Sequence, residues 1–142
     1  MRQVHNMKLK NSPFESIKCG YKVIELRLYD DKRQKLNVND YIVFSKETNP
    51  EEKIAVCVKA LYLFPTFKEL FQEIPMVKCG FDENISLDEA IECMHRIYAI
   101  EDEKTCGVVG IKVSLEDLKD VLESEEGIYS KKSDQILLDR MK

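Results

Sequence analysis

The chain has 142 residues, which is enough for one domain with its own core and too few for a multidomain enzyme. Hydrophobic residues make up 44% and charged residues 34%, a composition that excludes both a disordered chain and a membrane-embedded protein. The net charge is −4, but residues 1–46 carry ten Lys and Arg against five Asp and Glu, a net charge of +5, and the remainder carries −9. A basic amino-terminal third indicates an anionic partner.

The cysteines and histidines predict no metal site. The five cysteines are odd in number and never spaced Cys-x-x-Cys, and no secretory signal precedes them, so we expect reduced thiols in a cytoplasmic protein. His5 and His95 are too far apart for a local zinc motif. No phosphate-binding glycine loop, nucleophile elbow or dinucleotide fingerprint occurs. We therefore expect neither a metal nor a cofactor.

The first third of the chain predicts a strand, a helix and a second strand. Residues 3–9 alternate weakly between apolar and polar side chains, as a strand does. Ser12 is a predicted N-cap, followed by Pro and Glu at the positions expected of a capping box, so a short helix is expected over 13–19. Gly20 is placed to end that helix. Strand-forming residues then alternate over 23–29, before a charged turn.

The middle of the chain predicts two further strands and two helices. A strand over 38–44, entered through an Asn-Asp turn, is followed by a loop and a long strand over 54–64. Capping boxes that begin at Thr66 and Ser86 predict two amphipathic helices, of which the second carries the stronger apolar stripe.

The last third predicts a strand buried on both faces over 106–113. Ser114 is then expected to cap a helix that contains residues 115–122, and a polar tail follows up to a short docking helix at 136–138. Strands and helices are mixed without regular alternation along the chain. The predicted fold class is therefore α+β.

The densest group of charges lies between the first predicted helix and the strand that follows it. It reads G-x-K-x-x-E-x-R, with Gly20, Lys22, Glu25 and Arg27 at the specified positions. This pattern resembles the hallmark of the ASCH domains, named for activating signal cointegrator homology. Three further motifs of that family occur in order: the D-x-K-R turn at 30–33, Asn39-Asp40 in place of Gly-Asp, and GVVGI at 107–111, which follows a segment with Tyr98, Glu101 and Glu103. The resemblance covers residues 5–113.

The resemblance implies a PUA-like fold, a small mixed β-barrel with helices over its openings. This domain would occupy residues 1–114, and residues 115–142 would form a carboxy-terminal helix and tail. It also implies binding of RNA or a nucleotide in a basic groove. The expected nucleic-acid contacts are Lys22, Arg27, Lys32, Arg33 and Tyr98. Core packing is the alternative role of Tyr98, and Lys32 and Arg33 are equally explained as solvated turn residues.

One branch of the family, the bacterial N(4)-acetylcytidine amidohydrolases, is enzymatic. Its members use the lysine of this motif, a threonine three residues later and a glutamate before the second large helix. The lysine corresponds to Lys22 and the glutamate to Glu83, but Glu25 stands at the threonine position. A threonine hydroxyl acts as a nucleophile beside a base, whereas a carboxylate acts as a base or holds a cation. This departure argues against the amide hydrolysis of that branch.

Three functional hypotheses from different classes follow. The first is a non-catalytic module that binds RNA or a nucleotide. The second is a hydrolase acting on a modified nucleoside or on RNA, with Lys22, Glu25 and Glu83 as catalytic residues. The third is a protein-interaction domain, for which an apolar patch around 136–141 would argue. From the residues alone, Glu25 is also explained by a simple ion pair with Arg27, and Glu83 by its place before a helix.

Overall fold

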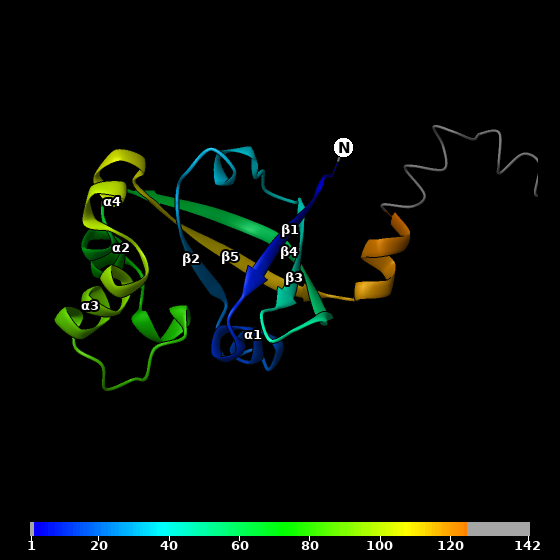
Figure 1. The fold of residues 1–142 in the computed structure, drawn as a ribbon, viewed down its shortest axis with the longest axis horizontal. Helices are drawn as coiled ribbons and strands as arrows, with labels where there is room; N and C mark the ends of the chain where they lie inside the picture. Colours follow the sequence, from blue (N-terminus) through cyan, green and yellow to red (C-terminus); the bar gives the residue numbers. More distant parts are fainter. Residues whose placement is uncertain (1, 125–142) are drawn as a thin grey trace, which may run out of the picture.

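Five strands form one mixed sheet in residues 2–124, the part of the chain that the computed structural model describes (Figure 1). The strands are β1 (Val4–Leu9), β2 (Ile24–Leu28), β3 (Tyr41–Lys46), β4 (Asn49–Phe64) and β5 (Val108–Glu116). The α-helices are α1 (Asn11–Lys18), α2 (Phe67–Glu73), α3 (Leu87–Ile97) and α4 (Ile100–Cys106), and two 3₁₀ helices are η1 (Arg33–Lys35) and η2 (Met76–Cys79). Residues 118–124 are also helical.

The sheet order β1-β3-β4-β5-β2 leaves β1 and β2 at the two edges. β1 runs parallel to β3, and the other three pairings are antiparallel. The long strand β4 pairs with β3 and with β5, and a register shift between Val58 and Ala60 interrupts its pairing with β5. The sheet curls into a half-barrel, so β1 and β2 face each other, and helices α2, α3 and α4 gather at one end (Figure 1). The predicted α+β, PUA-like barrel is confirmed.

Two clusters of buried side chains stabilise the fold. The first fills the inside of the curled sheet, where Phe14 and Ile17 of α1 pack against strand residues such as Phe44. The second lies between β2 and the helices α2 and α3, and it contains Phe67, Leu70 and other fully buried groups. Burying a side chain of this size contributes about 1.5–3 kcal/mol. Helices α2 and α3 are therefore packed on the sheet at its edge strand β2.

The helix starts follow the predicted capping signals in two of four places. Ser86 caps α3 with a complete capping box, and the Thr66 side chain accepts a hydrogen bond from the backbone of Glu69 at the start of α2. The N-cap expected at Ser12 is wrong: α1 begins at Asn11, because the chain enters it directly from β1 and Lys10 holds the N-cap position.

The prediction that a helix begins after Ser114 is also wrong, because the helical residues begin at 118. β5 continues to Glu116 because β4 offers pairing partners that far, with Ala55 opposite Glu116. Asp117 caps the helical residues that follow, and its side chain accepts a hydrogen bond from the Asp120 backbone at 3.0 Å.

Helix α4 was not predicted from the sequence, because an acidic segment shows no apolar stripe. One of its acids, Glu103, is nevertheless buried and accepts hydrogen bonds from the Phe67 backbone at 2.7 Å and from His95 at 2.8 Å. The division of the chain at residue 114 stays a prediction, and the docking helix expected at 136–138 lies outside the described residues. Among residues 2–124, no helix is long and apolar enough to span a bilayer.

Candidate functional site

A cleft of about 430 Å³ lies beside β2, between α1 and α3. Its floor is formed by β2 residues, one side by the end of β1 and the start of α1, and the other by η2 and α3. Except for Glu47, which lies in the turn between β3 and β4, the lining residues come from these five elements and their flanks: Lys8, Leu9, Lys10, Ser12, Pro13, Ser16, Lys22, Glu25, Leu26, Arg27, Cys79, Gly80, Phe81, Cys93, Met94, Ile97 and Tyr98.

The backbone between α1 and β2 is held on both sides, and this places the motif residues. Gly20 has φ of +86°, a left-handed conformation that turns the chain out of α1. The backbone N–H of Lys22 donates to Ser16 at 3.1 Å, and that of Val23 donates to Lys78 at 2.9 Å. Lys22 therefore enters the cleft from a segment anchored by both α1 and η2.

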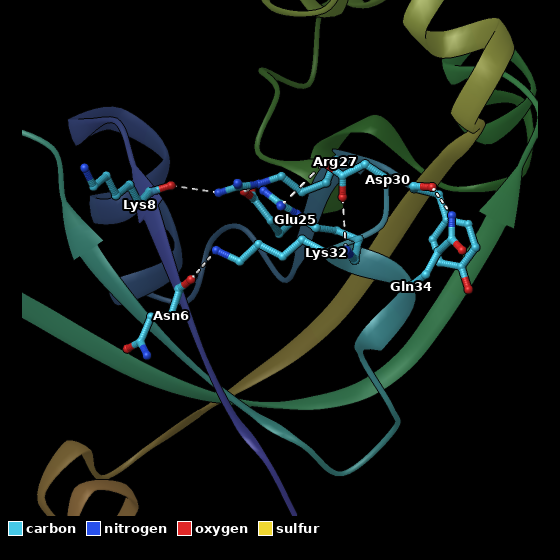
Figure 2. Close-up of polar contacts among 9 residues, drawn as sticks. Asn6, Lys8, Glu25, Arg27, Asp30, Lys32 and Gln34 are labelled. Atoms are coloured by element: carbon cyan, nitrogen blue, oxygen red, sulfur yellow. Dashed lines mark hydrogen bonds and ion pairs between the residues drawn. The ribbon is translucent and has the colours of Figure 1, made fainter.

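A buried chain of three charges forms the floor of the cleft. The Glu25 carboxylate lies 2.9 Å from Lys22 Nζ. It also lies 2.7 Å from Arg27 Nε, and a second Arg27 nitrogen donates to the backbone oxygen of Lys8 at 2.8 Å (Figure 2). Glu25 is only 3% exposed. Burial alone would raise its pKa, but Lys22 and Arg27 outweigh burial and hold the pKa of Glu25 below its usual value. Glu25 is thus an ionised carboxylate that orients two cations.

The Lys22 side chain is confined by a close approach to Gly80. Gly80 has φ of +97°, and a Cβ atom built there would lie 2.9 Å from Lys22 Cδ. Any larger residue at this position would push against the lysine stem. The glycine thus serves the turn after η2 and also leaves room for Lys22.

The opposite wall of the cleft is apolar. It contains Phe81, Met94, Ile97 and Tyr98, and Ile97 is 57% exposed. Tyr98 stacks on Phe67 with ring centroids 5.9 Å apart, so the ring is part of the core and also lines the cleft. Tyr98 is thus placed both to pack in the core and to contact a ligand in the cleft. Burial raises the pKa of its hydroxyl, which stays protonated at neutral pH.

The lining has more positive than negative charge. Four basic residues and two acidic residues line the cleft, and Lys8 and Lys10 make no ion pair within residues 2–124. One of the two acids, Glu25, is already bonded to two cations. The cleft therefore combines an apolar wall with a lining of net positive charge, and such a site favours a ligand with an apolar face and a polar or anionic edge.

The structure brings most of the predicted site residues together. Four of them line the cleft: Lys22, Glu25, Arg27 and Tyr98. Lys32 and Arg33 are not among the lining residues, but they lie close enough to Arg27 for its charge to lower the pKa of each, after burial as the larger cause. Glu83 lies in an exposed turn and does not line the cleft.

Several lining residues could not be identified as site residues from the sequence. Lys8 and Lys10 were part of the basic amino-terminal third, but no motif singled them out. Met94 was assigned to the core stripe of its helix, which is correct, and it also reaches the cleft. Phe81 and Ile97 carry no local signal, because only the packing of η2 and α3 against β2 makes them neighbours of Lys22.

Two cysteines, Cys79 and Cys93, line the cleft. Cys79 is buried beside the charged floor, and burial raises the pKa of its thiol to about 12, so it remains a neutral thiol. No group of three or more His, Cys, Asp and Glu side chains in this part of the chain is arranged to hold a metal ion.

Comparison with known proteins gives a family match and several similar structures. A family model described as the ASCH domain matches residues 7–138. The crystal structure of hypothetical protein PH0355 is 30% identical, with a TM-score of 0.70 over 80% of this chain and 100% of that chain. The solution structure of protein PF0455 from Pyrococcus furiosus is 30% identical, with a TM-score of 0.63 over 81% of this chain and 99% of that chain.

A more distant structure shares the fold alone. The crystal structure of ASCH from Zymomonas mobilis is 12% identical, with a TM-score of 0.59 over 87% of this chain and 79% of that chain. No curated protein matches the chain.

Proposed function

The chain belongs to the ASCH domain family, and from this membership and the geometry of the cleft we propose that it binds RNA or a nucleotide there. Domains of this family are generally RNA-binding. The observation that carries the proposal is the pairing of a fixed Lys22–Glu25–Arg27 floor with an apolar wall that includes Tyr98. A nucleobase has both features that such a site requires, a flat face and a polar edge.

The charged floor suits binding because its cations are oriented before a ligand arrives. Lys22 has three N–H donors and Glu25 accepts from one of them, so donors remain for a base edge or a phosphate oxygen. The guanidinium of Arg27 donates both to Glu25 and to the Lys8 backbone oxygen, so it is held by two partners. Side chains fixed in this way lose little conformational freedom on binding, which favours affinity.

Hydrolysis of a modified nucleoside or of RNA is the second candidate. It is favoured by the direct 2.9 Å contact between Lys22 and Glu25 on the floor of a cleft. The state of Glu25 argues for binding instead, because both carboxylate oxygens are bonded to cations and its lowered pKa makes it a weak base. Glu83, the third residue of this hypothesis, lies outside the cleft. The segment at 136–141, on which the protein-interaction hypothesis depends, is outside the described residues.

The proposal is tested by titrating labelled short single-stranded RNA and following its fluorescence anisotropy at several salt concentrations. Affinity should fall with salt, with a logarithmic slope of about 0.7 for each phosphate contacted. Lys22→Met keeps the side-chain stem that packs on Gly80 and removes the charge, so we expect a loss of about tenfold or more. The matched control is Lys35→Met, in η1, which should bind like the wild type. Equal binding by the two variants would exclude this cleft as the site.

The hydrolase candidate needs a separate assay. The protein is incubated with N(4)-acetylcytidine and with single-stranded RNA, and the products are separated by chromatography. The binding function predicts no product from either. Turnover that is abolished both by Lys22→Met and by Glu25→Gln would establish the hydrolase instead, and turnover that survives both would place the chemistry elsewhere in the molecule.

A further inference from the structure

Two cationic side chains bridge the seam between the edge strands of the curled sheet. Arg27 of β2 donates to the backbone oxygen of Lys8 at 2.8 Å, and Lys32, which precedes η1, donates to that of Asn6 at 2.7 Å. Both acceptors belong to β1, and Figure 2 shows both side chains extending toward that strand. Alternate residues of an edge strand present their carbonyl groups to its unpaired side, so these bonds fill vacant acceptors. They also hold the two charges at fixed positions along the seam.

A third cation lies beside these two, and the cluster is short of negative charge. Arg33 has Asp30 as its ion-pair partner, at 3.6 Å, and the buried Arg33 Nε has no hydrogen-bond partner within residues 2–124. Burial, and then repulsion among the three cations, lowers the pKa of Lys32 and of Arg33, against the opposing effect of Asp30. Glu25, whose charge also acts to raise the pKa of Arg33, is shared with Lys22 and Arg27, to which it is directly bonded.

This cluster borders the proposed binding cleft, because Arg27 belongs to both. Arginine forms paired hydrogen bonds with phosphate oxygens, and lysine supplies a point charge to the same group. We propose that Arg27, Lys32 and Arg33 form a phosphate subsite that holds the phosphodiester group next to the base in the cleft. The ligand class is then a nucleotide chain rather than a free nucleoside. This inference rests on the proposed function of the cleft.

Isothermal titration calorimetry with four RNA homotrinucleotides and their four nucleosides tests the subsite. The double variant Lys32→Gln/Arg33→Gln keeps amide donors, including one that can reach the Asn6 carbonyl, but removes both charges. We expect the wild type to bind its preferred trinucleotide at least tenfold more tightly than the nucleoside. The double variant should lose about tenfold for the trinucleotide, and its affinity for the nucleoside should not change. Lys35→Gln, an exposed lysine of the same 3₁₀ helix, is the matched control and should leave both affinities unchanged.

The outcomes separate this inference from the function on which it rests. Trinucleotide and nucleoside affinities that are equal in the wild type, or that fall by the same factor in the double variant, overturn the phosphate subsite and leave the cleft intact. If neither class of ligand binds, the proposed function of the cleft fails. Thermal unfolding of each variant, followed by circular dichroism, checks that a lost affinity does not reflect a lost fold.

Discussion

Replacing Glu25 with glutamine removes the acid shared by two buried cations, and its effect on stability can be worked out from the structure. Glu25 is 3% exposed, and the side chains of Lys22 and Arg27 are 10% and 12% exposed. At an effective dielectric constant of about 20, unit charges 4 Å apart attract by about 4 kcal/mol, and the present contacts are shorter. Removing one partner of a buried ion pair typically lowers the free energy of unfolding by about 3–5 kcal/mol, because the other charge is left uncompensated. We expect a loss of that size, a large part of the roughly 5–15 kcal/mol typical of a domain.

The assay is urea unfolding followed by circular dichroism, with the free energy of unfolding taken from the transition midpoint at an unchanged slope. The matched control is Glu92→Gln, because Glu92 pairs with Arg96 at 2.9 Å and both side chains are 66% exposed. Exposed helical pairs of this kind contribute little to stability, because water screens the two charges. The two pairs are similar in contact distance and differ in burial. If Glu25→Gln costs no more than Glu92→Gln, the reasoning from burial is refuted.

The same variant predicts a dependence on pH. Lys22 and Arg27 hold the pKa of Glu25 below its ordinary value of 4.5 despite burial, so its stabilising contribution is fully present above that pH and is lost as the pH falls through the folded-state pKa. The difference in unfolding free energy between wild type and Glu25→Gln should therefore be constant near neutral pH and shrink below about pH 4.5. A difference that stays constant down to strongly acidic pH would contradict the assignment.

Two further predictions concern Gly80 and the thiols. Gly80→Ala should cost about 1–2 kcal/mol of stability for its left-handed backbone and should also weaken RNA binding by displacing Lys22. Gly20 has a similar φ and open space around it, so Gly20→Ala should show the stability loss without the binding loss. Equal RNA binding by the two variants would contradict the role of the close approach between Gly80 and Lys22. A thiol reagent at pH 8 should label the exposed Cys19 quickly. The buried Cys79, whose thiol has a pKa of about 12, should be labelled only on unfolding. Rapid labelling of both cysteines in the folded protein would contradict the burial of Cys79.

The features of this protein that were predictable from its sequence are those encoded over a few residues. The capping box at Ser86 defines the start of α3, and the spacing of Lys22, Glu25 and Arg27 places all three within one short segment. The left-handed turn at Asn39, where the family has glycine, follows from the same local chemistry, because asparagine tolerates that conformation better than most residues.

The features that could not be predicted from the sequence depend on hydrogen-bond partners that are distant in the chain. Helix α4 was not predicted, because Glu103 is buried through its hydrogen bonds with the Phe67 backbone and His95, which belong to other helices. The end of β5 was placed too early, since only β4 determines how far β5 can continue pairing. In both cases the deciding hydrogen-bond partner is long-range, and residue patterns contain no information about it.

The net charge of −4 and its division between a basic third and an acidic remainder follow from the sequence alone, as do the motif and the fold class. Only the tertiary structure decided that Glu25 is buried and that Tyr98 and Ile97 face Lys22 across a cleft. Residue types and spacings specify charge, periodicity and helix starts, because these are properties of neighbouring residues. Burial and the walls of a cleft arise when α3 packs on the edge strand β2, and long-range packing of this kind determines which charges stay in water and which are held in a binding site.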